Sequence, residues 1–382
     1  IYTLSLHDAL PILPIDVKCP VLQRMTDMIA HRGPDSEGHY IDEHAALGHR
    51  RLSIIDLGGG QQPIYNEDGS KVITFNGEIY NYQTLREELI AAGHTFTTKS
   101  DTEVLLHGYE QWGVDLLQRV RGMFTFVIWD KNKQELFGAR DHFGIKPFYY
   151  AKMNGTFMYA SEIKSLLRHP DFVKELNAEA LKPYMTFQYP AIGETFFKGV
   201  YKLPEGHYFT YRDGKMDIHR YYDEDFREGK QKLGELVNSI DQTVCDSVKA
   251  HQIADVEVGS FLSSGVDSSY VAAVARPQHT YSIGFGKGTY NESQQAGELA
   301  ELLKLNNTAE SLTDEEAFAA FPRIQWHLDE PDSNPSCVPL YFLSALAAKD
   351  VKVVLSGEGA DELFAGYIDY GVHTKFKPIK VV

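Results

Sequence analysis

Cysteine and long apolar runs are scarce in this sequence. The three cysteines, Cys19, Cys245 and Cys337, are too few and too scattered for a disulfide framework, and no CxxC pair indicates a structural zinc site. No apolar run is long enough to span a bilayer, and the opening IYTLSLHDALPIL lacks a basic leader. We therefore expect neither a membrane protein nor an exported one, and we predict a cytoplasmic location.

Basic charge is also in short supply. The 37 lysines and arginines face 53 aspartates and glutamates, which gives a formal net charge of -16. Such a balance repels phosphate backbones and anionic lipids, so nucleic acid and membrane surfaces are not expected as partners. The 382 residues exceed one ordinary compact core, and we expect two domains.

The stretch from about 25 to 222 shows short strands bounded by turn residues, together with a few helices. The predicted strands lie at 71–76, 123–129, 134–139 and 147–151. This pattern is typical of sheets packed with some helix.

Two helices are predicted in this part. One covers 84–92, places Leu85, Leu89 and Ile90 on one side, and ends at Gly93. The other opens at Ser100, where SDTE reads as a capping box.

A charged stretch at 223–234 separates this part from a different pattern. Beyond it, strands and helices are predicted to alternate, with strands at 256–262, 280–285 and 351–355 and helices from Ser268 and near 293–303. Such alternation predicts a parallel sheet with helices on its faces. Ligands of these sheets bind beyond the carboxyl ends of the strands.

Two segments of the second part follow predicted strands and indicate a phosphate ligand with its cation. SFLSSGVDSS (260–269) leads through small residues into a helix, and no lysine follows its glycine, which excludes a Walker A loop. Asp267 in that loop would repel phosphates unless a divalent cation bridges them. SGEGADE (356–362) brings Glu358, Asp361 and Glu362 to another strand end. The alternatives are a serine-rich helix cap and solvated loop acids.

These motifs resemble a known family. SSGVDSS resembles the pyrophosphate-binding loop of the PP-loop ATP pyrophosphatases, and SGEGADELFAGY (356–367) resembles the signature of class B asparagine synthetases. In order and spacing, HRGPDSEG (31–38), LGHRRLSIIDL (47–57), FNGEIYNY (75–82) and SDTEVLL (100–106) resemble the glutaminase domain of the same synthetases. The resemblance covers roughly residues 25–370.

The resemblance implies a fold for each part. An α+β N-terminal nucleophile (Ntn) hydrolase sandwich (αββα) is expected first, followed by an α/β PP-loop, Rossmann-like parallel-sheet domain. We expect residues 1–12 to be a non-native leader, 13–222 the glutamine amidotransferase domain, 223–234 a linker and 235–382 the synthetase domain. The chain is expected to be a fragment, truncated at both ends.

The resemblance also implies an ATP site with Mg²⁺. It assigns Asp267 and Asp361 to the metal and Glu358 to a base that assists ammonia attack. The residues implied in pyrophosphate binding are Ser263, Ser264, Gly265, Asp267 and Ser268, and those implied in the adenosine pocket are Leu262, Ile283, Ser356 and Gly357. The family motif usually reads LFGGY, so Ala365 departs from it and is expected to crowd the backbone.

Glutamine presents a carboxylate, an ammonium and an amide, so its pocket needs a cation, an anion and oxyanion donors. Carried over from the family, Arg51 suits the carboxylate, Asp101 and Glu78 the ammonium, and Asn76 with Gly77 the oxyanion. The remaining implied glutamine-binding residues are Leu52, Ser53, Ile54 and Ile55. Taken singly, Arg51 could form a surface ion pair, Asp101 a first-turn acid, and Asn76 with Gly77 a simple turn.

The family places its nucleophile, a cysteine at the mature amino terminus, about 28 residues before HRGPD. Here that place falls near Tyr2, and the family's CGxxG-type strand is expected to be missing. Cys19 lies 12 residues before His31 at a predicted helix entry, and we expect it to be an ordinary, partly buried cysteine.

The resemblance implies a carbon–nitrogen ligase that uses glutamine, aspartate and ATP to form asparagine, AMP, pyrophosphate and glutamate. The match at HFGIKPFYY (142–150) favours asparagine as the product. Two alternatives stay open: a related amidotransferase that amidates another carboxylate, and a non-catalytic paralogue that binds glutamine and nucleotide. A homodimer is compatible with the sequence.

Overall fold

A computed structural model describes residues 2–6, 15–189, 191–225, 229–285 and 292–367. The chain forms two compact units, the first built from 1–230 with 325–334 and the second from 231–324 with 335–382. Residues 7–12 of the expected leader and 226–228 of the expected linker lie outside the described residues.

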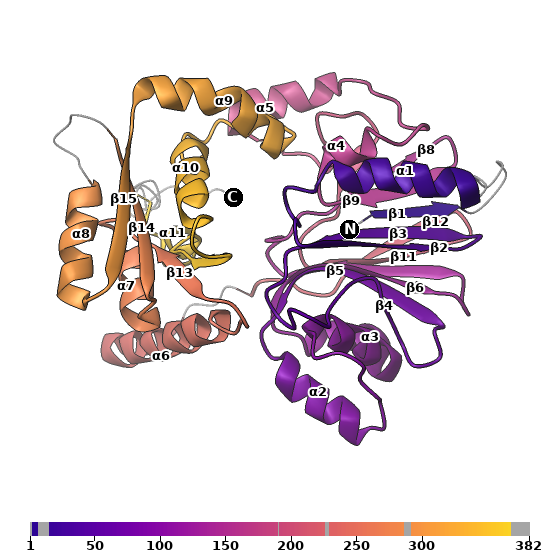
Figure 1. Ribbon diagram of the computed structural model, residues 1–382, viewed down its shortest axis with the longest axis horizontal. Coiled ribbons are helices and arrows are strands. Elements are labelled where there is room, and N and C mark those ends of the chain that lie inside the picture. Colours follow the sequence, from indigo (N-terminus) through magenta and orange to yellow (C-terminus); the bar gives the residue numbers. More distant parts are fainter. Residues whose placement is uncertain (1, 7–14, 190, 226–228, 286–291, 368–382) are drawn as a thin grey trace. The chain divides into compact units, whose positions relative to one another are not determined.

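The first unit contains two six-stranded antiparallel sheets (Figure 1). The first sheet has the order β10-β8-β9-β1-β3-β2, with β1 at Tyr2–Leu6, β2 at Ser36–Ile41, β3 at Ala45–Arg51, β8 at Tyr149–Met153, β9 at Thr156–Ala160 and β10 at Val200–Lys202. The second has the order β12-β11-β7-β6-β5-β4, with β4 at Ile64–Tyr65, β5 at Lys71–Ile79, β6 at Gly122–Asp130, β7 at Glu135–Arg140, β11 at His207–Arg212 and β12 at Lys215–Arg220.

Side chains that alternate along the strands build the layers of this unit. On β3, Leu47 joins the core between the two sheets, whereas its neighbour Ala46 joins the core beneath helix α1 (Ile15–Asp27) and α4 (Ile163–Leu166). Helix α3 (Asp101–Trp112) packs on β5, and α2 (Tyr82–Ala91) packs on α3. The expected αββα sandwich is thereby confirmed. Short helices η1 (Gly113–Gln118), η2 (Ala178–Ala180) and α5 (Leu181–Phe187) complete the unit.

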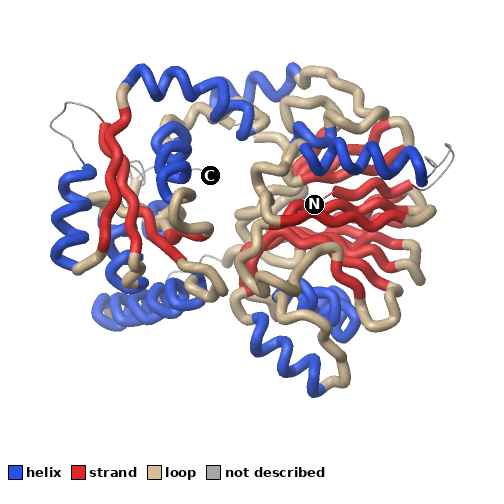
Figure 2. Tube along the Cα trace, viewed as in Figure 1, coloured by secondary structure: helices blue, strands red, loops and turns tan. Residues whose placement is uncertain are grey.

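The second unit contains a four-stranded parallel sheet of order β15-β14-β13-β16 (Figure 2). Its strands are β13 (Val258–Phe261), β14 (His279–Phe285), β15 (Asn306–Leu312) and β16 (Val353–Leu355). Its helices are α6 (Leu233–His251), α7 (Val266–Ala275), α8 (Glu292–Leu303), α9 (Asp314–Leu328, which enters the first unit at Gln325), α10 (Cys337–Ala347) and α11 (Ala360–Phe364).

Helices cover both faces of this parallel sheet. On β13, Val258 packs with apolar side chains of α6 and α7, whereas Phe261, three residues on and therefore on the other face, packs with those of α10. The expected α/β parallel-sheet architecture is confirmed.

Residues 325–334 leave the second unit and belong to the first. The Asp329 carboxylate accepts the Ile163 backbone N–H at 2.6 Å and pairs with Lys164 at 2.9 Å, and both charged side chains are buried. Next to it, Glu330 pairs with Lys202 at 2.6 Å. This segment is thus attached by charge-assisted bonds.

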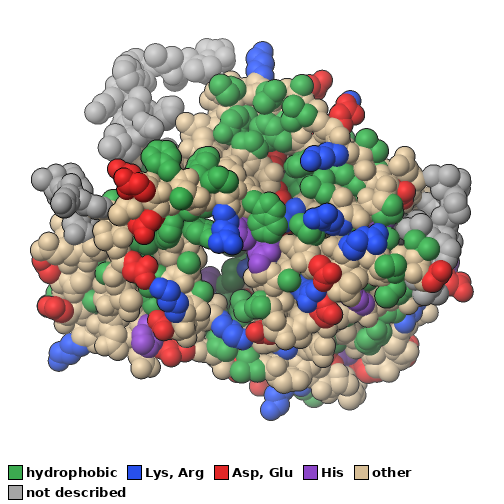
Figure 3. Space-filling model, turned by 45° about the horizontal axis from the view of Figure 1, so that its top comes forward, with side chains coloured by type: hydrophobic (Ala, Val, Ile, Leu, Met, Phe, Trp, Pro, Cys, Tyr) green, Lys and Arg blue, Asp and Glu red, His purple; other side chains and the backbone are tan. Residues whose placement is uncertain are grey.

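No helix among the described residues is both long and apolar enough to cross a bilayer. Acidic, basic and hydrophobic side chains are interspersed on the face shown in Figure 3.

Several local expectations were wrong. Leu85 and Leu89 are buried on α2, but Ile90 is 52% exposed, because it lies one position beyond the i, i+4 pair. Helix α7 begins at Val266, two residues before Ser268. Cys19 is exposed on α1 rather than partly buried.

Two further expectations need correction. Ser100 does cap α3 by accepting the Thr102 N–H, but the Glu103 carboxylate turns to the N–H groups of Thr97 and Thr98 instead of completing a capping box. At the start of the chain, Tyr2–Leu6 forms strand β1 between β3 and β9, although the family's motif is missing there. Ladder hydrogen bonds come from the backbone, so this pairing does not require that motif.

Candidate functional site

The first unit contains a cavity of about 350 Å³ beside β3, β5 and the start of α3. Eight of the nine side chains expected to bind glutamine line it, namely Arg51, Leu52, Ile54, Ile55, Asn76, Gly77, Glu78 and Asp101. Ser53 does not line it, and its backbone N–H is held by the Asp35 carboxylate. Segments that are far apart in the sequence thus meet around one space.

Arg51 ends β3 and is only 7% exposed. Its Nη2 donates to the carbonyl oxygens of Ile55 and Asp56, both at 2.8 Å. Burial lowers the pKa of this guanidinium, although nearby carboxylates oppose the shift. The side chain is therefore a fixed cation on the cavity wall and not part of a surface ion pair.

Two carboxyl groups face this cavity. Asp101, the first residue of α3, is 4% exposed and accepts the Ile79 N–H at 3.0 Å. Burial raises the pKa of both Asp101 and Glu78, and repulsion between the two carboxylates raises that of Glu78 further. A cation placed between them would favour their charged forms.

Strand β5 supplies hydrogen-bonding groups from Asn76 and its neighbours. Asn76 and Glu78 lie two residues apart and so share one face of the strand. The Asn76 Nδ2 and Glu78 Oε2 atoms are buried and make no hydrogen bond to any described residue. Because buried donors and acceptors are normally paired, these two atoms mark a place for a polar ligand.

The position of Gly77 has no room for a side chain. Its φ is +156°, and a Cβ there would lie 2.1 Å from the Met123 carbonyl oxygen on the adjacent strand. The glycine therefore lets β5 and β6 approach closely beside the cavity.

The sequence interpretation missed several residues that line the cavity, among them the polar residues His49, Lys146 and Gln62. His49 is buried, which lowers its pKa to about 3, and its Nε2 lies 3.0 Å from the Phe75 carbonyl oxygen. Burial lowers the pKa of Lys146. The side-chain amide of Gln62 bonds both backbone groups of Phe75: it donates to the carbonyl oxygen and accepts from the N–H. His49 and Lys146 lie inside quoted motifs, which was the available signal, whereas Gln62 lies outside them.

The second unit contains a cavity of about 340 Å³ at the carboxyl ends of β13, β14 and β16. It is lined by ten of the eleven residues expected here, namely Leu262, Ser263, Gly265, Asp267, Ser268, Ile283, Ser356, Gly357, Glu358 and Asp361. Ser264 is exposed and does not line it.

The serine loop folds around its own hydroxyl groups. Ser268 Oγ accepts the Ser263 N–H at 3.1 Å and lies 2.7 Å from Ser263 Oγ, which in turn accepts the Gly265 N–H. Gly357 fits against the start of α7, because a Cβ at that position would lie 2.7 Å from the Ser268 nitrogen. The two loops are therefore close neighbours at the helix N-terminus, where anions are favoured.

The acids of this cavity offer a suitable donor set for Mg²⁺. Asp267, Glu358 and Asp361 all line it, and carboxylate oxygens are the ligands that Mg²⁺ prefers. The chemistry of the lining residues thus fits the expected ion.

At Ala365 the structure shows an unfavourable backbone conformation, whereas the sequence predicted crowding of the backbone. It adopts a left-handed conformation, with φ +55° and ψ +45°, at the end of α11. The cost of the methyl group there is conformational, since L-residues rarely occupy this region and glycine does so freely.

Comparisons with known proteins agree with this arrangement. Residues 12–222 match the family described as a glutamine amidotransferase domain, and residues 239–378 match that described as asparagine synthase. The chain is 45% identical to glutamine-hydrolysing asparagine synthetase 1 of Bacillus subtilis, over 94% of this chain and 58% of the relative.

Two further relatives extend the comparison. One, from Methanocaldococcus jannaschii, has the provisional name glutamine-hydrolysing asparagine synthetase 2 and is 34% identical over 91% of this chain and 73% of its own length. Another, amidase chry2 of Gibberella zeae, is 33% identical over 94% of this chain and 58% of its own length. The chain thus spans a little over half the length of several relatives, and it belongs to the glutamine-hydrolysing asparagine synthetase family.

Proposed function

We propose that the protein to which this chain belongs makes asparagine from aspartate, ATP and glutamine, with 13–222 in the amidotransferase domain and 235–382 in the synthetase domain. The observation that supports it best is the first cavity, where a fixed guanidinium, two carboxyls and an unpaired amide donor surround one space. These groups match the three polar ends of glutamine in number and charge.

In the proposed glutamine site, each group has a separate task. Arg51 binds the α-carboxylate, and Asp101 with Glu78 binds the α-ammonium. The unpaired Nδ2 of Asn76 and the N–H of Gly77 donate to the oxygen of the amide as a nucleophile adds to the amide carbon and negative charge develops on that oxygen. Leu52, Ile54 and Ile55 form the adjoining wall. Ser53 would support this wall from behind, since its backbone N–H is bonded to the Asp35 carboxylate.

In the proposed synthetase site, Ser263, Ser264, Gly265, Asp267 and Ser268 hold pyrophosphate at the start of α7. Leu262, Ile283, Ser356 and Gly357 contact adenosine. Asp267 and Asp361 would hold Mg²⁺, which when bound neutralises phosphate charge. Glu358 would accept a proton from ammonia as it attacks the adenylated β-carboxylate of aspartate and displaces AMP.

Calorimetric titration with two variants tests the two-site assignment on this chain. Arg51→Ala should weaken L-glutamine binding at least ten-fold and leave ATP binding with Mg²⁺ unchanged. Asp267→Ala should do the reverse. Equal losses of both ligands in either variant, or no Mg²⁺-dependent ATP binding by the unaltered chain, would overturn the proposal.

In a protein as long as the relatives, the same two substitutions should separate glutamine hydrolysis from amide formation. Asp267→Ala should abolish ATP-dependent amide formation and spare glutamine hydrolysis. Arg51→Ala should raise the glutamine requirement and spare synthesis from free ammonia.

A second candidate is an amidotransferase that acts on another carboxylate. It is favoured by the similarity to a relative named as an amidase at the same coverage. Release of pyrophosphate that depends on aspartate and on no other carboxylic acid would exclude it.

We further propose a cytoplasmic location.

A further inference from the structure

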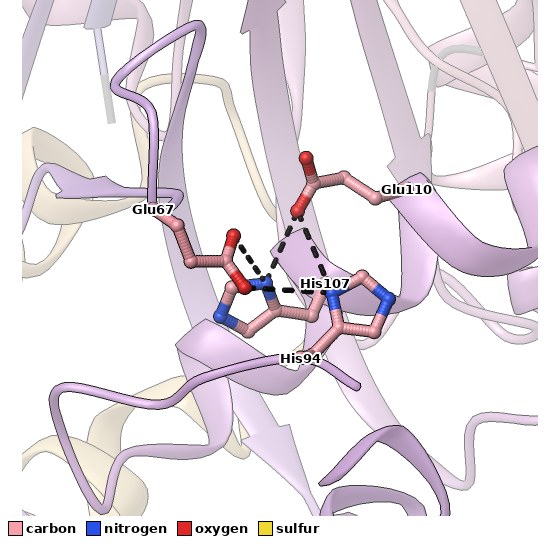
Figure 4. A group of neighbouring side chains, drawn as sticks. All are labelled: Glu67, His94, His107 and Glu110. Atoms are coloured by element: carbon pink, nitrogen blue, oxygen red, sulfur yellow. Dashed lines mark hydrogen bonds and ion pairs between the residues drawn. The ribbon is translucent and has the colours of Figure 1, made fainter. Parts of the chain in front are cut away.

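A group of four side chains lies outside both cavities, in the first unit (Figure 4). Glu67 comes from the turn between β4 and β5, His94 from the loop between α2 and α3, and His107 and Glu110 from α3 itself. One ligand atom from each lies within 4.8 Å of all the others. Three separate segments therefore point metal-binding atoms at one position.

The distances between these atoms approach those of a metal coordination shell. His107 Nδ1 lies 3.1 Å from Glu110 Oε2 and 3.5 Å from Glu67 Oε2. His94 Nδ1 lies 3.7 Å from Glu67 Oε1 and 3.9 Å from Glu110 Oε2. In a tetrahedral site with bonds of about 2.0–2.1 Å, neighbouring ligand atoms are about 3.3 Å apart. Small side-chain movements would close the shell.

An oxygen atom of another side chain lies near the far nitrogen of each histidine. The far nitrogen of His94, Nε2, lies 3.2 Å from Gln111 Oε1. The far nitrogen of His107 makes no hydrogen bond to a described residue but lies 3.5 Å from the carboxylate of Glu103, which is itself fixed by four hydrogen bonds from Thr97 and Thr98. The acceptor at His94 Nε2 favours the tautomer that keeps its proton there and leaves the Nδ1 lone pair facing the centre, and the nearby Glu103 charge favours the same tautomer of His107.

The carboxylates are oriented in the same way. Asn66 donates to Glu110 Oε1 at 2.7 Å and Lys71 donates to it at 3.3 Å, which leaves Oε2 toward the histidines. The Thr95 N–H donates to Glu67 Oε1 at 2.9 Å. Outer partners that hold both the imidazoles and the carboxylates are typical of protein metal sites.

We propose that Glu67, His94, His107 and Glu110 form a structural site for a divalent transition-metal ion of the Zn²⁺ type. Two imidazoles and two carboxylates suit Zn²⁺, and imidazole ligands disfavour Mg²⁺. Four protein ligands leave no open position, so the ion would hold structure and not activate water.

The ion would connect the β4–β5 turn and the α2–α3 loop to α3. Asp101 begins this helix and lines the first cavity, and His107 lies six residues further along it. Binding would thus stabilise the wall of the cavity without contact with its ligand. This site does not depend on the proposed function.

Zn²⁺ titration of the chelator-treated 382-residue chain tests the site. One equivalent of ZnCl₂ should bind tightly in the presence of excess MgCl₂ and raise the melting temperature. Co²⁺ should bind in its place and give visible absorption bands of a tetrahedral complex.

Variants of the partly exposed ligands assign the binding without endangering the fold. Glu67→Gln and His94→Gln should each weaken Zn²⁺ binding at least about 100-fold, and Gln111→Leu about ten-fold, since lost outer partners cost 10–100-fold. His219→Gln, at an exposed histidine of β12, should retain full binding. If Glu67→Gln and His94→Gln still bind one equivalent of Zn²⁺ tightly, or if the unaltered chain binds none tightly, the four side chains form an ion-pair cluster only.

Discussion

The acid pair of Glu78 and Asp101 gives the first cavity a pH-dependent response. The raised pKa values keep protons on these carboxyls longer than in the unfolded chain, so this contribution to stability is present at low pH and lost as pH rises through the folded values. An ammonium group bound between them reverses the shift.

We therefore expect L-glutamine binding at pH 7 to release protons and to weaken as the pH falls. Titration calorimetry in two buffers of different ionisation enthalpy measures this release. Asp101→Asn should bind more weakly and release less. A binding enthalpy independent of the buffer would contradict the assigned role of the pair.

Ala365 offers a test of backbone conformation. Ala365→Gly should raise the free energy of unfolding of the second unit by about 0.5–1 kcal/mol, because glycine removes the left-handed strain but adds entropy to the unfolded chain. Urea unfolding measures the change. An unaltered or lower midpoint would mean that the strain is relieved elsewhere.

Single residues could be predicted where a motif and a chemical requirement coincide. Arg51, Asn76 and Asp101 lie in motifs and line one cavity, as the proposed glutamine ligand would require. His107 and Glu67 have no such signal, because their segments meet only after the sheets and α3 have packed. Ser53 shows the limit of a motif, since it does not line the cavity and its backbone N–H is bonded to Asp35 instead.

At the scale of elements, runs of apolar residues bounded by turn residues predicted the long strands well. β5 and β6 were found within a few residues because buried side chains dominate them. β15 was missed, because it is an edge strand of sequence NNTAESL whose side chains are largely exposed. Such a strand forms through backbone pairing with β14, which apolar periodicity cannot reveal.

The segment 325–334 should contribute measurably to the first unit. Asp329→Asn removes the carboxylate that pairs with buried Lys164, and Glu162, at 2.6 Å, compensates in part. We expect a loss of about 2 kcal/mol, below the usual 3–5 kcal/mol for a broken buried pair. Chemical denaturation monitored on the first unit measures it.

Glu175→Gln provides the matched control for Asp329→Asn. It removes one partner of the exposed pair between Glu175 and Lys198 in the same unit, and it should change stability much less. Equal effects of both substitutions would contradict the attachment of the segment through Asp329.

At the scale of the whole molecule, each ligand should protect its own unit. Hydrogen exchange should show L-glutamine slowing the amides of 76–79 and 101–104, and ATP with Mg²⁺ slowing those of 263–268 and 356–361, because bound ligand stabilises the state it binds. Asp267→Asn should remove only the second effect. Protection of both regions by either ligand would contradict two separate sites.

The division into two domains was predictable from the sequence. A charged stretch separates a part with short strands and turns, which forms antiparallel sheets, from a part in which strands and helices alternate. The assignment of 325–334 to the first unit was not predictable, because it depends on Asp329 and Glu330 meeting lysines that precede them by more than a hundred residues.

The excursion of 325–334 has a practical consequence for anyone who wishes to study the halves apart. The polypeptide passes between the units three times, so a single cut near residue 230 separates 325–334 from the rest of the first unit. Lys164 then loses Asp329 and keeps only Glu162, whereas Lys202 loses Glu330. To produce the first unit alone, one would join residues 325–334 to its end through a short designed loop.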